Sequence, residues 1–171
     1  NFSGQSSELL DISKYDNIAK QLIKHDILKT VTDLAIQEWR EQLSVNSNCN
    51  IYRILKTDFN FEKYLVKLNT YDRINMTKFR TSNNRLPVNR FRFSLNNNEK
   101  MCNLCDSVDL GDEYHYLFIC NYFQTNRELY LSQYFRTHPS TLKMQNLFES
   151  TNKKTQLNLK KFISKILKHF H

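Results

Sequence analysis

Apolar side chains recur along the N-terminal part of this chain at the spacing of an α-helix. Between residues 14 and 44 they stand three or four positions apart, which places neighbours on one side of a helix. They are Ile18, Leu22, Ile23, Ile27, Leu28, Val31, Leu34, Ala35, Trp39 and Leu43. We therefore expect a helix over 14–44, with a break near His25 and Asp26.

Shorter helical patterns follow a polar loop at residues 46–50. Two short helices, or a helix and a turn, are expected from the apolar positions Tyr52, Leu55, Phe59, Tyr64, Leu65 and Leu68. Residues 70–80 predict a further helix. The pair Leu86-Pro87 interrupts any helix, because proline lacks the backbone donor and biases the preceding residue toward an extended conformation. We expect a short strand or an extended arm at 89–93.

The C-terminal part of the chain again shows helical periodicity. Residues 122–135 predict one helix, and Pro139 suits the first turn of the next. A last apolar stripe predicts a helix with one buried face. The stripe comprises Leu159, Phe162, Ile163, Ile166, Leu167 and Phe170.

Composition supports a mainly α-helical fold. The 171 residues include only two glycines and two prolines, whereas tight-turned β structure needs residues with positive φ at its corners. The length is sufficient for one sizeable core. Because the chain begins with asparagine, we expect it to be a piece of a longer polypeptide.

The most specific feature is a cluster of metal-binding residue types. Cys102 and Cys105 form a Cys-x2-Cys pair, and His115 and Cys120 form a His-x4-Cys pair, with nine residues between the two pairs. Three thiolates and an imidazole are the ligand set of a closed, tetrahedral structural zinc site. We predict one structural Zn²⁺. The alternative is a cluster of buried thiols without a metal.

The spacing of these ligands makes further predictions. On an ideal helix His115 and Cys120 would lie about 140° apart, so we expect the helix to end or distort near Cys120. Gly111 and Asp112 are expected to end the preceding loop and cap that helix. Four protein ligands leave no position for an activated water. Zinc deaminases are excluded, since their His-x-Glu precedes a Pro-Cys-x-x-Cys, whereas here the Cys-x-x-Cys comes first.

The expected fold is therefore a helical domain with an embedded Cys-Cys-His-Cys zinc knuckle. We expect N-terminal helices at 1–45, a helical segment with a basic arm at 46–100, and the knuckle with C-terminal helices at 101–171. Together they are expected to form one compact unit.

Neither a signal-peptide pattern nor an apolar run of about 20 residues, enough to span a membrane, is found in the sequence. Four cysteines would also suit two disulfides in a secreted protein, but their spacing favours metal ligation in a reducing compartment. We expect a nuclear or cytoplasmic protein with no membrane partner. Cys49 is expected to be a small buried or loop residue, not a fifth ligand.

The formal net charge of +8 is unevenly distributed. Residues 73–100 carry seven basic side chains and one acidic one, and residues 150–171 carry six basic side chains and none that is acidic. The remaining segments are close to neutral or mildly acidic. This asymmetry indicates a polyanionic partner, and we expect RNA, DNA or both.

Candidate nucleic-acid contacts lie in the first basic segment. Arginine offers forked donors to phosphate, and exposed aromatic rings stack on bases. The basic candidates are Arg73, Lys78, Arg80, Arg85, Arg90, Arg92 and Lys100, interleaved with Phe79, Phe91 and Phe93. We expect the arginines to contact phosphate and the phenylalanines to belong to the core. The lysines of residues 150–171 are either further phosphate contacts or the solvated face of a helix.

Four stretches resemble the C-terminal region of non-LTR (LINE-type) retrotransposon reverse transcriptases. They are IYRILKTDFNFEKYL, KFRTSNNRLPVNRFRF, CNLCDSVDLGDEYHYLFICNYFQTNRELYL and YFRTHPS. The resemblance covers roughly residues 30–170, and its most specific element is the Cys-Cys-His-Cys motif after a Lys-Phe-Arg segment. In that family the region lies downstream of the polymerase domain and is implicated in binding template RNA or target DNA. The resemblance implies the same four zinc ligands.

The chain also departs from that family. After Leu-Pro, members often read Val-Glu-x-Gly-Arg, whereas residues 88–92 read Val-Asn-Arg-Phe-Arg. A paired-aspartate polymerase motif, a nuclease-like acidic cluster and a restriction-type endonuclease segment are all missing from the sequence. We therefore expect a non-catalytic segment of an RNA-directed DNA polymerase, with the remainder of that polypeptide as a partner. The alternative is a zinc-stabilised protein-interaction or assembly module, which salt-dependent nucleic-acid binding would distinguish.

Overall fold

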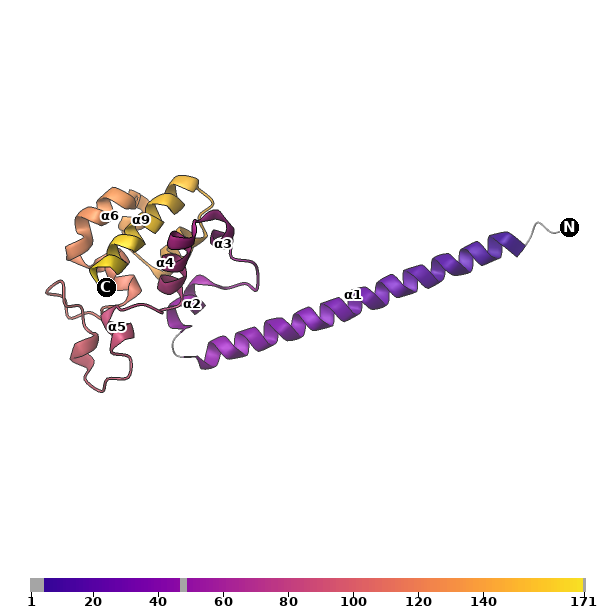
Figure 1. Cartoon of the computed structure of the whole chain (residues 1–171), viewed down its shortest axis with the longest axis horizontal. Coiled ribbons are helices and arrows are strands. Elements are labelled where there is room, and N and C mark those ends of the chain that lie inside the picture. Colours follow the sequence, from indigo (N-terminus) through magenta and orange to yellow (C-terminus); the bar gives the residue numbers. More distant parts are fainter. Residues whose placement is uncertain (1–4, 47–48, 171) are drawn as a thin grey trace. The chain divides into compact units, whose positions relative to one another are not determined.

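The computed structural model describes residues 5–46 and 49–170, with side chains from Tyr15 onward. Most of these residues are helical, and the described part of the chain contains no strand, only one isolated antiparallel bridge between Met101 and Leu110. The expected mainly α-helical fold is confirmed. The chain divides into two units, Asn1–Val45 and Asn46–His171 (Figure 1).

The described part of the first unit is one continuous helix, α1 (Gln5–Val45). The expected break near His25 and Asp26 is wrong: neither proline nor glycine, the usual causes of a kink, is present there, and both side chains are solvated and paired at 3.6 Å. Apolar residues often follow one another by four positions, which exceeds the 3.6 residues of a helical turn. They therefore wind around α1 instead of forming one straight stripe.

The second unit consists of short helices followed by a longer one. They are α2 (Asn50–Leu55), α3 (Tyr64–Lys67), α4 (Thr70–Arg80), α5 (Pro87–Arg90), α6 (Gln124–Tyr130), α7 (Gln133–Arg136), α8 (Thr141–Glu149) and α9 (Lys153–His169), with 3₁₀ turns at Asn97–Lys100 and Asn121–Phe123 and a π-helical turn at His115–Ile119. The helix expected at 70–80 is confirmed as α4. It begins after Asn69, whose side chain accepts a hydrogen bond from the backbone N–H of Asp72 at 2.9 Å.

Pro87 begins a helix, so the strand or extended arm expected at 89–93 is wrong. Leu86 is extended, with ψ 149°, and Pro87 occupies the first position of α5. There the fixed φ of proline suits the helix and its missing donor leaves no bond unmade. The N–H groups of Arg90 and Phe91 then donate to the carbonyls of Leu86 and Pro87 at 2.8 and 3.0 Å.

Two boundaries in the C-terminal part also differ from expectation. The helix expected over 122–135 is divided into α6 and α7, because Leu131 turns to an extended conformation and buries its side chain between them. Pro139 precedes α8 and does not lie in its first turn. The residue that caps α8 is Ser140, whose hydroxyl accepts from the N–H of Lys143 at 3.2 Å.

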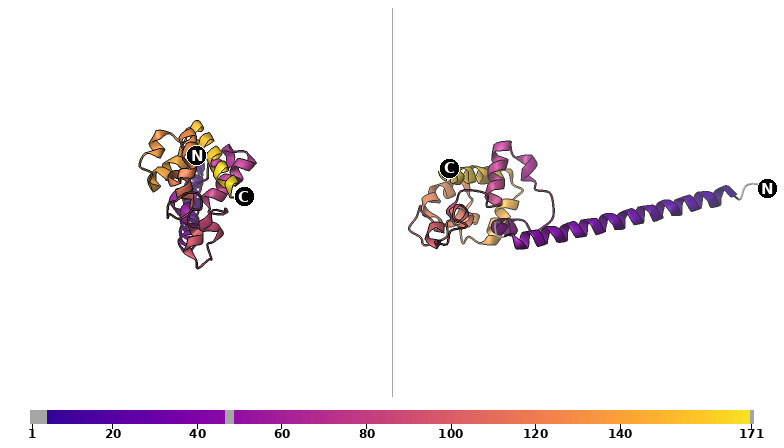
Figure 2. Two further views of the ribbon diagram at one scale, coloured as in Figure 1. Left: turned by 90° about the vertical axis from the view of Figure 1, so that its left-hand side faces the viewer. Right: turned by 60° about the horizontal axis from the view of Figure 1, so that its bottom comes forward.

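The core of the second unit is built around α9, the yellow helix of Figures 1 and 2. This helix packs against α4, α6 and α8. The predicted apolar stripe supplies its buried face, with Leu159, Phe162, Ile163, Ile166 and Leu167 all buried. Each such side chain contributes about 1.5–3 kcal/mol when it leaves water. The C-terminal helix is therefore stabilised mainly by apolar burial.

Candidate metal centre and the adjoining basic segment

Cys102, Cys105, His115 and Cys120 converge on one point, where they could hold a metal ion. Their ligand atoms all lie within 4.8 Å of one another. The sulfur of Cys102 lies 3.5 Å from that of Cys105 and 3.8 Å from that of Cys120. Nε2 of His115 lies 3.4 Å from the Cys105 sulfur. In a tetrahedral zinc site, with metal–sulfur and metal–nitrogen distances of about 2.3 and 2.0–2.1 Å, neighbouring donors stand about 3.5–3.8 Å apart. The four residues therefore fit such an ion.

The first two ligands lie on a tight turn of the finger, the name used below for residues 101–120. The N–H of Cys102 donates to the carbonyl of Asp109 at 2.9 Å, and that of Gly111 donates to Lys100 at 2.8 Å. Inside the turn, the N–H of Leu104 points at the Cys102 sulfur at 3.4 Å. A backbone donor at this place stabilises a thiolate.

His115 and Cys120 are brought together by the expected helix distortion. Asp112 caps the helix, since its Oδ1 accepts from the N–H of His115 at 2.7 Å. The N–H of Cys120 then donates to the carbonyl of His115, five residues earlier, at 2.8 Å. This bond closes a π-helical turn, which is wider than an α-helical one. The predicted cap and the predicted distortion are both confirmed.

Buried Arg127 stabilises this wide turn by hydrogen bonds to its carbonyl groups. Its Nε donates to the carbonyl of Leu117 at 3.0 Å and its Nη2 to that of Cys120 at 2.8 Å. These are carbonyls near a helix end, which would otherwise lack partners. Burial lowers the pKa of Arg127. A positive charge thus lies against the backbone of one ligand, as expected for a site in which three thiolates exceed the charge of a divalent ion.

Two of the clustered thiols, Cys105 and Cys120, differ in how readily they lose a proton. Burial raises the pKa of Cys120 to about 12, and the neighbouring Cys102 adds to this effect. Burial also opposes ionisation of Cys105, but hydrogen bonds with Ser107, Cys102 and His115 lower its pKa to about 6. Cys105 therefore ionises more readily than Cys120, and a bound cation would favour proton loss from Cys120.

The second ring nitrogen of His115 faces a carboxylate that sequence spacing did not identify. Nδ1 lies 3.5 Å from Oδ2 of Asp109, too far for a strong hydrogen bond. With Nε2 turned toward the sulfurs, this carboxylate favours the tautomer that carries its proton on Nδ1. Carboxylates in this position orient a ligating imidazole.

A buried carboxylate joins the finger to the segment before it. Oε1 of Glu113 accepts from the side-chain amides of Asn84 and Asn89 at 2.8 and 2.7 Å, and burial raises the pKa of Glu113. Gly111 packs closely here: a Cβ at that position would lie 2.9 Å from Cγ of Pro87. The segment between the two asparagines is therefore fixed to the finger. Nothing in the sequence pattern identified this link, because it joins residues 24 and 29 positions apart.

Two of the seven basic candidates are engaged within the protein. Arg80 is only 3% exposed and pairs with Glu62 at 3.0 Å. Arg92 donates to the carbonyls of Asn89 and Ser82 at 3.0 and 3.1 Å. The expectation that Arg80 contacts phosphate is corrected, because burial removes it from solvent. Through these two hydrogen bonds, Arg92 stabilises the local backbone around residues 82–92.

The other five basic candidates reach the surface to different degrees. Arg85 and Arg90 are exposed, whereas Arg73, Lys78 and Lys100 are partly exposed. Lys78 and Arg85 line one hollow of about 240 Å³, and none of the described residues lining it is acidic. The structure thus brings together these two candidates, with Arg90 on the same finger-bound segment as Arg85.

The three phenylalanines differ in burial. Phe79 is fully buried and stacks on Phe148 with ring centroids 6.1 Å apart, so its expected place in the core is confirmed. Phe91 is half-buried beneath the guanidinium of Arg90, which lies 5.2 Å from the ring centroid. Phe93 is 90% exposed, and its expected place in the core is therefore wrong.

Cys49 immediately precedes α2 and does not belong to the metal-binding group. None of the described helices is both long and apolar enough to cross a membrane. Comparison of the chain with protein-family models, with curated proteins and with solved structures gives no match.

Proposed function

We propose that this chain is a non-catalytic nucleic-acid-binding domain in which one structural zinc ion holds the finger. The choice of zinc is supported by the ligand set, three sulfurs and an imidazole nitrogen that all lie within 4.8 Å of one another. All four positions are taken by protein atoms, which suits a structural site better than one that activates water.

The observation that carries the nucleic-acid proposal is the placement of Arg85 and Arg90. Both are exposed, Arg85 between the two asparagines that Glu113 binds and Arg90 directly after the second of them. Phosphate would reach Arg85 from the hollow that this residue shares with Lys78. The ring of Phe93, three residues beyond Arg90, is exposed and would be available to stack on a base. Zinc would thus act indirectly, by keeping this surface rigid.

The motif order supports a place for this domain in a retrotransposon-type reverse transcriptase, where it would bind template RNA or target DNA in the nucleus or cytoplasm. The catalytic residues would then belong to other parts of the polypeptide.

The test is a titration of the chain with RNA, single-stranded DNA and duplex DNA across salt concentrations. Affinity should fall with a log–log slope of about 0.7–0.9 per phosphate contacted. The double variant Arg85→Ala/Arg90→Ala should reduce that slope by roughly 2 units and retain its zinc. The matched control Lys24→Ala/Lys29→Ala removes the same charge from exposed positions of α1, and it should bind as the wild type does.

The second candidate is a protein-interaction module. It is favoured by Leu95 and Val108, apolar side chains that are 101% and 86% exposed. If the chain bound no nucleic acid at low salt, or if the arginine pair had no effect, this second function would replace the first.

A further inference from the structure

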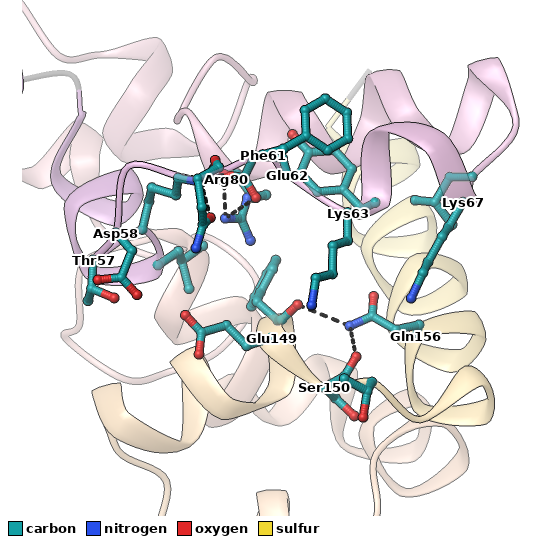
Figure 3. A pocket seen from close by; sticks show the side chains of 17 residues that line it. Thr57, Asp58, Phe61, Glu62, Lys63, Lys67, Arg80, Glu149, Ser150 and Gln156 are labelled. Carbon is teal, nitrogen blue, oxygen red and sulfur yellow. Dashed lines mark hydrogen bonds and ion pairs between the residues drawn. The ribbon is translucent and has the colours of Figure 1, made fainter. Parts of the chain in front are cut away.

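A second hollow, of about 280 Å³, opens in the helical unit away from the finger (Figure 3). Its walls are the loop from Lys56 to Lys63, helix α3, the end of α8 and the start of α9. Its volume approaches that of small-molecule sites, about 300–1,000 Å³. It is therefore large enough for more than an isolated ion.

Two buried cations form the inner end of this hollow. Arg80 Nη2 lies 3.0 Å from both carboxylate oxygens of Glu62, and Nζ of Lys56 lies 3.7 Å from the same carboxylate. Arg80 is held between the rings of Tyr64 and Phe148, at 5.2 and 5.5 Å. One carboxylate faces two cations, so the group keeps a net positive charge.

The Arg80 guanidinium also has an unused donor. Its Nε is buried and has no hydrogen-bond partner among the described residues. A buried charge whose donors are incompletely paired is costly in the absence of a ligand. Because this nitrogen is buried, Arg80 would attract an anion in the hollow through its charge and not through a hydrogen bond from Nε.

The opposite wall adds two lysines that the protein leaves without an acidic partner in its described part. Figure 3 shows Lys63 and Lys67 extending from the α3 side toward Gln156 and Ser150. Ser150 leads into α9, a helix of 17 residues whose N-terminus carries partial positive charge. An anion in this space would meet two ammonium groups close to the start of α9.

The charge of the lining is mixed, which restricts where an anion can lie. Asp58 and Glu149 also line the hollow, and Figure 3 shows them on the side away from Lys67. The four basic and three acidic lining residues leave a net charge of +1. The anionic group must therefore lie on the lysine side.

The remaining lining suits a flat apolar ring. Leu55, Tyr64, Leu68 and Phe148 line the hollow, and Phe61, which is 65% exposed, stands at its rim. Aromatic side chains at a rim are suited to stack on a nucleobase. We propose that this hollow binds the phosphate of a nucleotide between Lys63, Lys67 and the start of α9, with the base against the aromatic rim. The choice of a nucleotide among phosphate compounds rests on the proposed nucleic-acid function.

The first experiment is a calorimetric titration of the full chain with AMP and, separately, with inorganic phosphate. AMP should bind saturably with a Kd on the order of 1 mM or tighter, and more tightly than phosphate because of the base. The exposed pair Lys63→Ala/Lys67→Ala should weaken AMP at least about tenfold, since each lysine supplies a charge-assisted contact. No saturation at AMP concentrations on the order of 10 mM, or an unchanged Kd in the double variant, would overturn the proposal.

Two further variants separate a specific site from general electrostatic attraction. Lys161→Ala/Lys165→Ala removes the same charge from exposed positions of α9 that do not line the hollow, and it should leave the Kd for AMP unchanged. Glu149→Gln removes a nearby negative charge and should tighten AMP binding by a few-fold. An equal loss in both lysine pairs would contradict a local site.

The second experiment distinguishes a free nucleotide from the end of a strand. Oligonucleotides with a 5′-phosphate, a 3′-phosphate or neither are compared, each with and without AMP as competitor. If the chain prefers one phosphorylated end, and AMP abolishes that preference, the hollow binds strand ends. If all three oligonucleotides bind equally and AMP still binds, the hollow takes free nucleotides. If AMP binds but no oligonucleotide does, the proposed nucleic-acid function is wrong, whereas the proposed nucleotide site in the hollow is supported. If oligonucleotides bind and AMP does not, the proposed nucleotide site is wrong, whereas the proposed nucleic-acid function is supported.

Discussion

Between Met101 and Cys120 the chain forms a turn, one isolated bridge and a π-helical turn, whereas between Lys153 and His169 it forms a single regular helix. The helix buries an apolar stripe mainly against α4, α6 and α8, and it also contacts the π-helical turn of the finger. The finger gathers four metal-binding side chains, and its backbone follows the needs of those ligands. The two regions share one unit but depend on different forces.

This difference shows where a metal ion matters most. Removing apolar surface from water stabilises α9 whether or not an ion is present. The finger has to hold three sulfurs close together, and proton loss from Cys120 is opposed by burial. Its stability should therefore depend on metal concentration and pH, while that of the helical core should not.

The largest expected effect follows from removing a ligand. Cys102→Ser should abolish zinc binding, which in zinc-finger peptides is worth an apparent value of about 10–16 kcal/mol. Hydrogen exchange should then show loss of amide protection in the finger, while α9 remains protected. The control Cys49→Ser lies outside the metal-binding group and should retain both zinc and protection. Simultaneous loss of protection in both regions of Cys102→Ser would remove the distinction between them.

The second prediction concerns a substitution in the helical core. Phe162→Ala replaces a fully buried side chain of α9, so the free energy of unfolding should fall by about 3–5 kcal/mol. Zinc content of the folded protein should not change. The neighbouring exposed Lys161→Ala should alter stability by less than about 0.5 kcal/mol. Urea unfolding followed by circular dichroism measures both.

A smaller effect is expected at the link between the finger and its basic segment. Glu113→Ala removes one acceptor from each of the half-buried amides of Asn84 and Asn89. Each amide keeps a second acceptor, so the total cost should be about 1–3 kcal/mol. Glu113→Gln keeps an accepting oxygen and should cost much less. Equal losses in the two variants, measured by urea unfolding, would show that the hydrogen bonds do not matter.

Comparison of wild type with Glu113→Gln also predicts how the free energy of unfolding depends on pH. Burial raises the folded-state pKa of Glu113 above its value in the unfolded chain. Its contribution is therefore greatest below the unfolded pKa and is lost as pH rises through the folded pKa. The stability of Glu113→Gln relative to wild type should rise over that interval. Protonation of the metal ligands affects both proteins equally, so it cancels in the difference between their free energies of unfolding.

The smallest effect is expected at Asp109, which faces the second nitrogen of His115. Its contact at 3.5 Å is long and half-exposed, so Asp109→Asn should reduce zinc affinity by about tenfold, the lower end for residues that orient a ligand. Competition with a chelator measures this change. The exposed Asp106→Asn serves as a matched control, and an identical loss there would mean that only general charge matters.

The sequence predicted those features that depend on local pattern. Helix α4, the buried stripe of α9 and the four metal-binding residues were all expected, because helical periodicity and ligand spacing act over a few residues. An end or distortion of the helix near Cys120 was also expected, since two ligands five positions apart cannot share an ion on a regular helix; that this distortion is a π-helical turn is seen only in the structure.

What the sequence missed depends on distant partners. Arg80 belonged to a basic run, and nothing near it indicated that Glu62 and the ring of Phe148 would enclose it. Phe93 has the same residue type as Phe79 and opposite exposure. Burial of a single side chain is decided by tertiary packing, which periodicity does not determine within an irregular segment.

The measurement that tests the central claim most directly is zinc quantification of the purified chain, combined with hydrogen exchange before and after chelation. The account predicts about one equivalent of zinc per chain, with finger amides protected only while it is bound and α9 protected throughout. A chain without metal whose finger amides remain protected would contradict it.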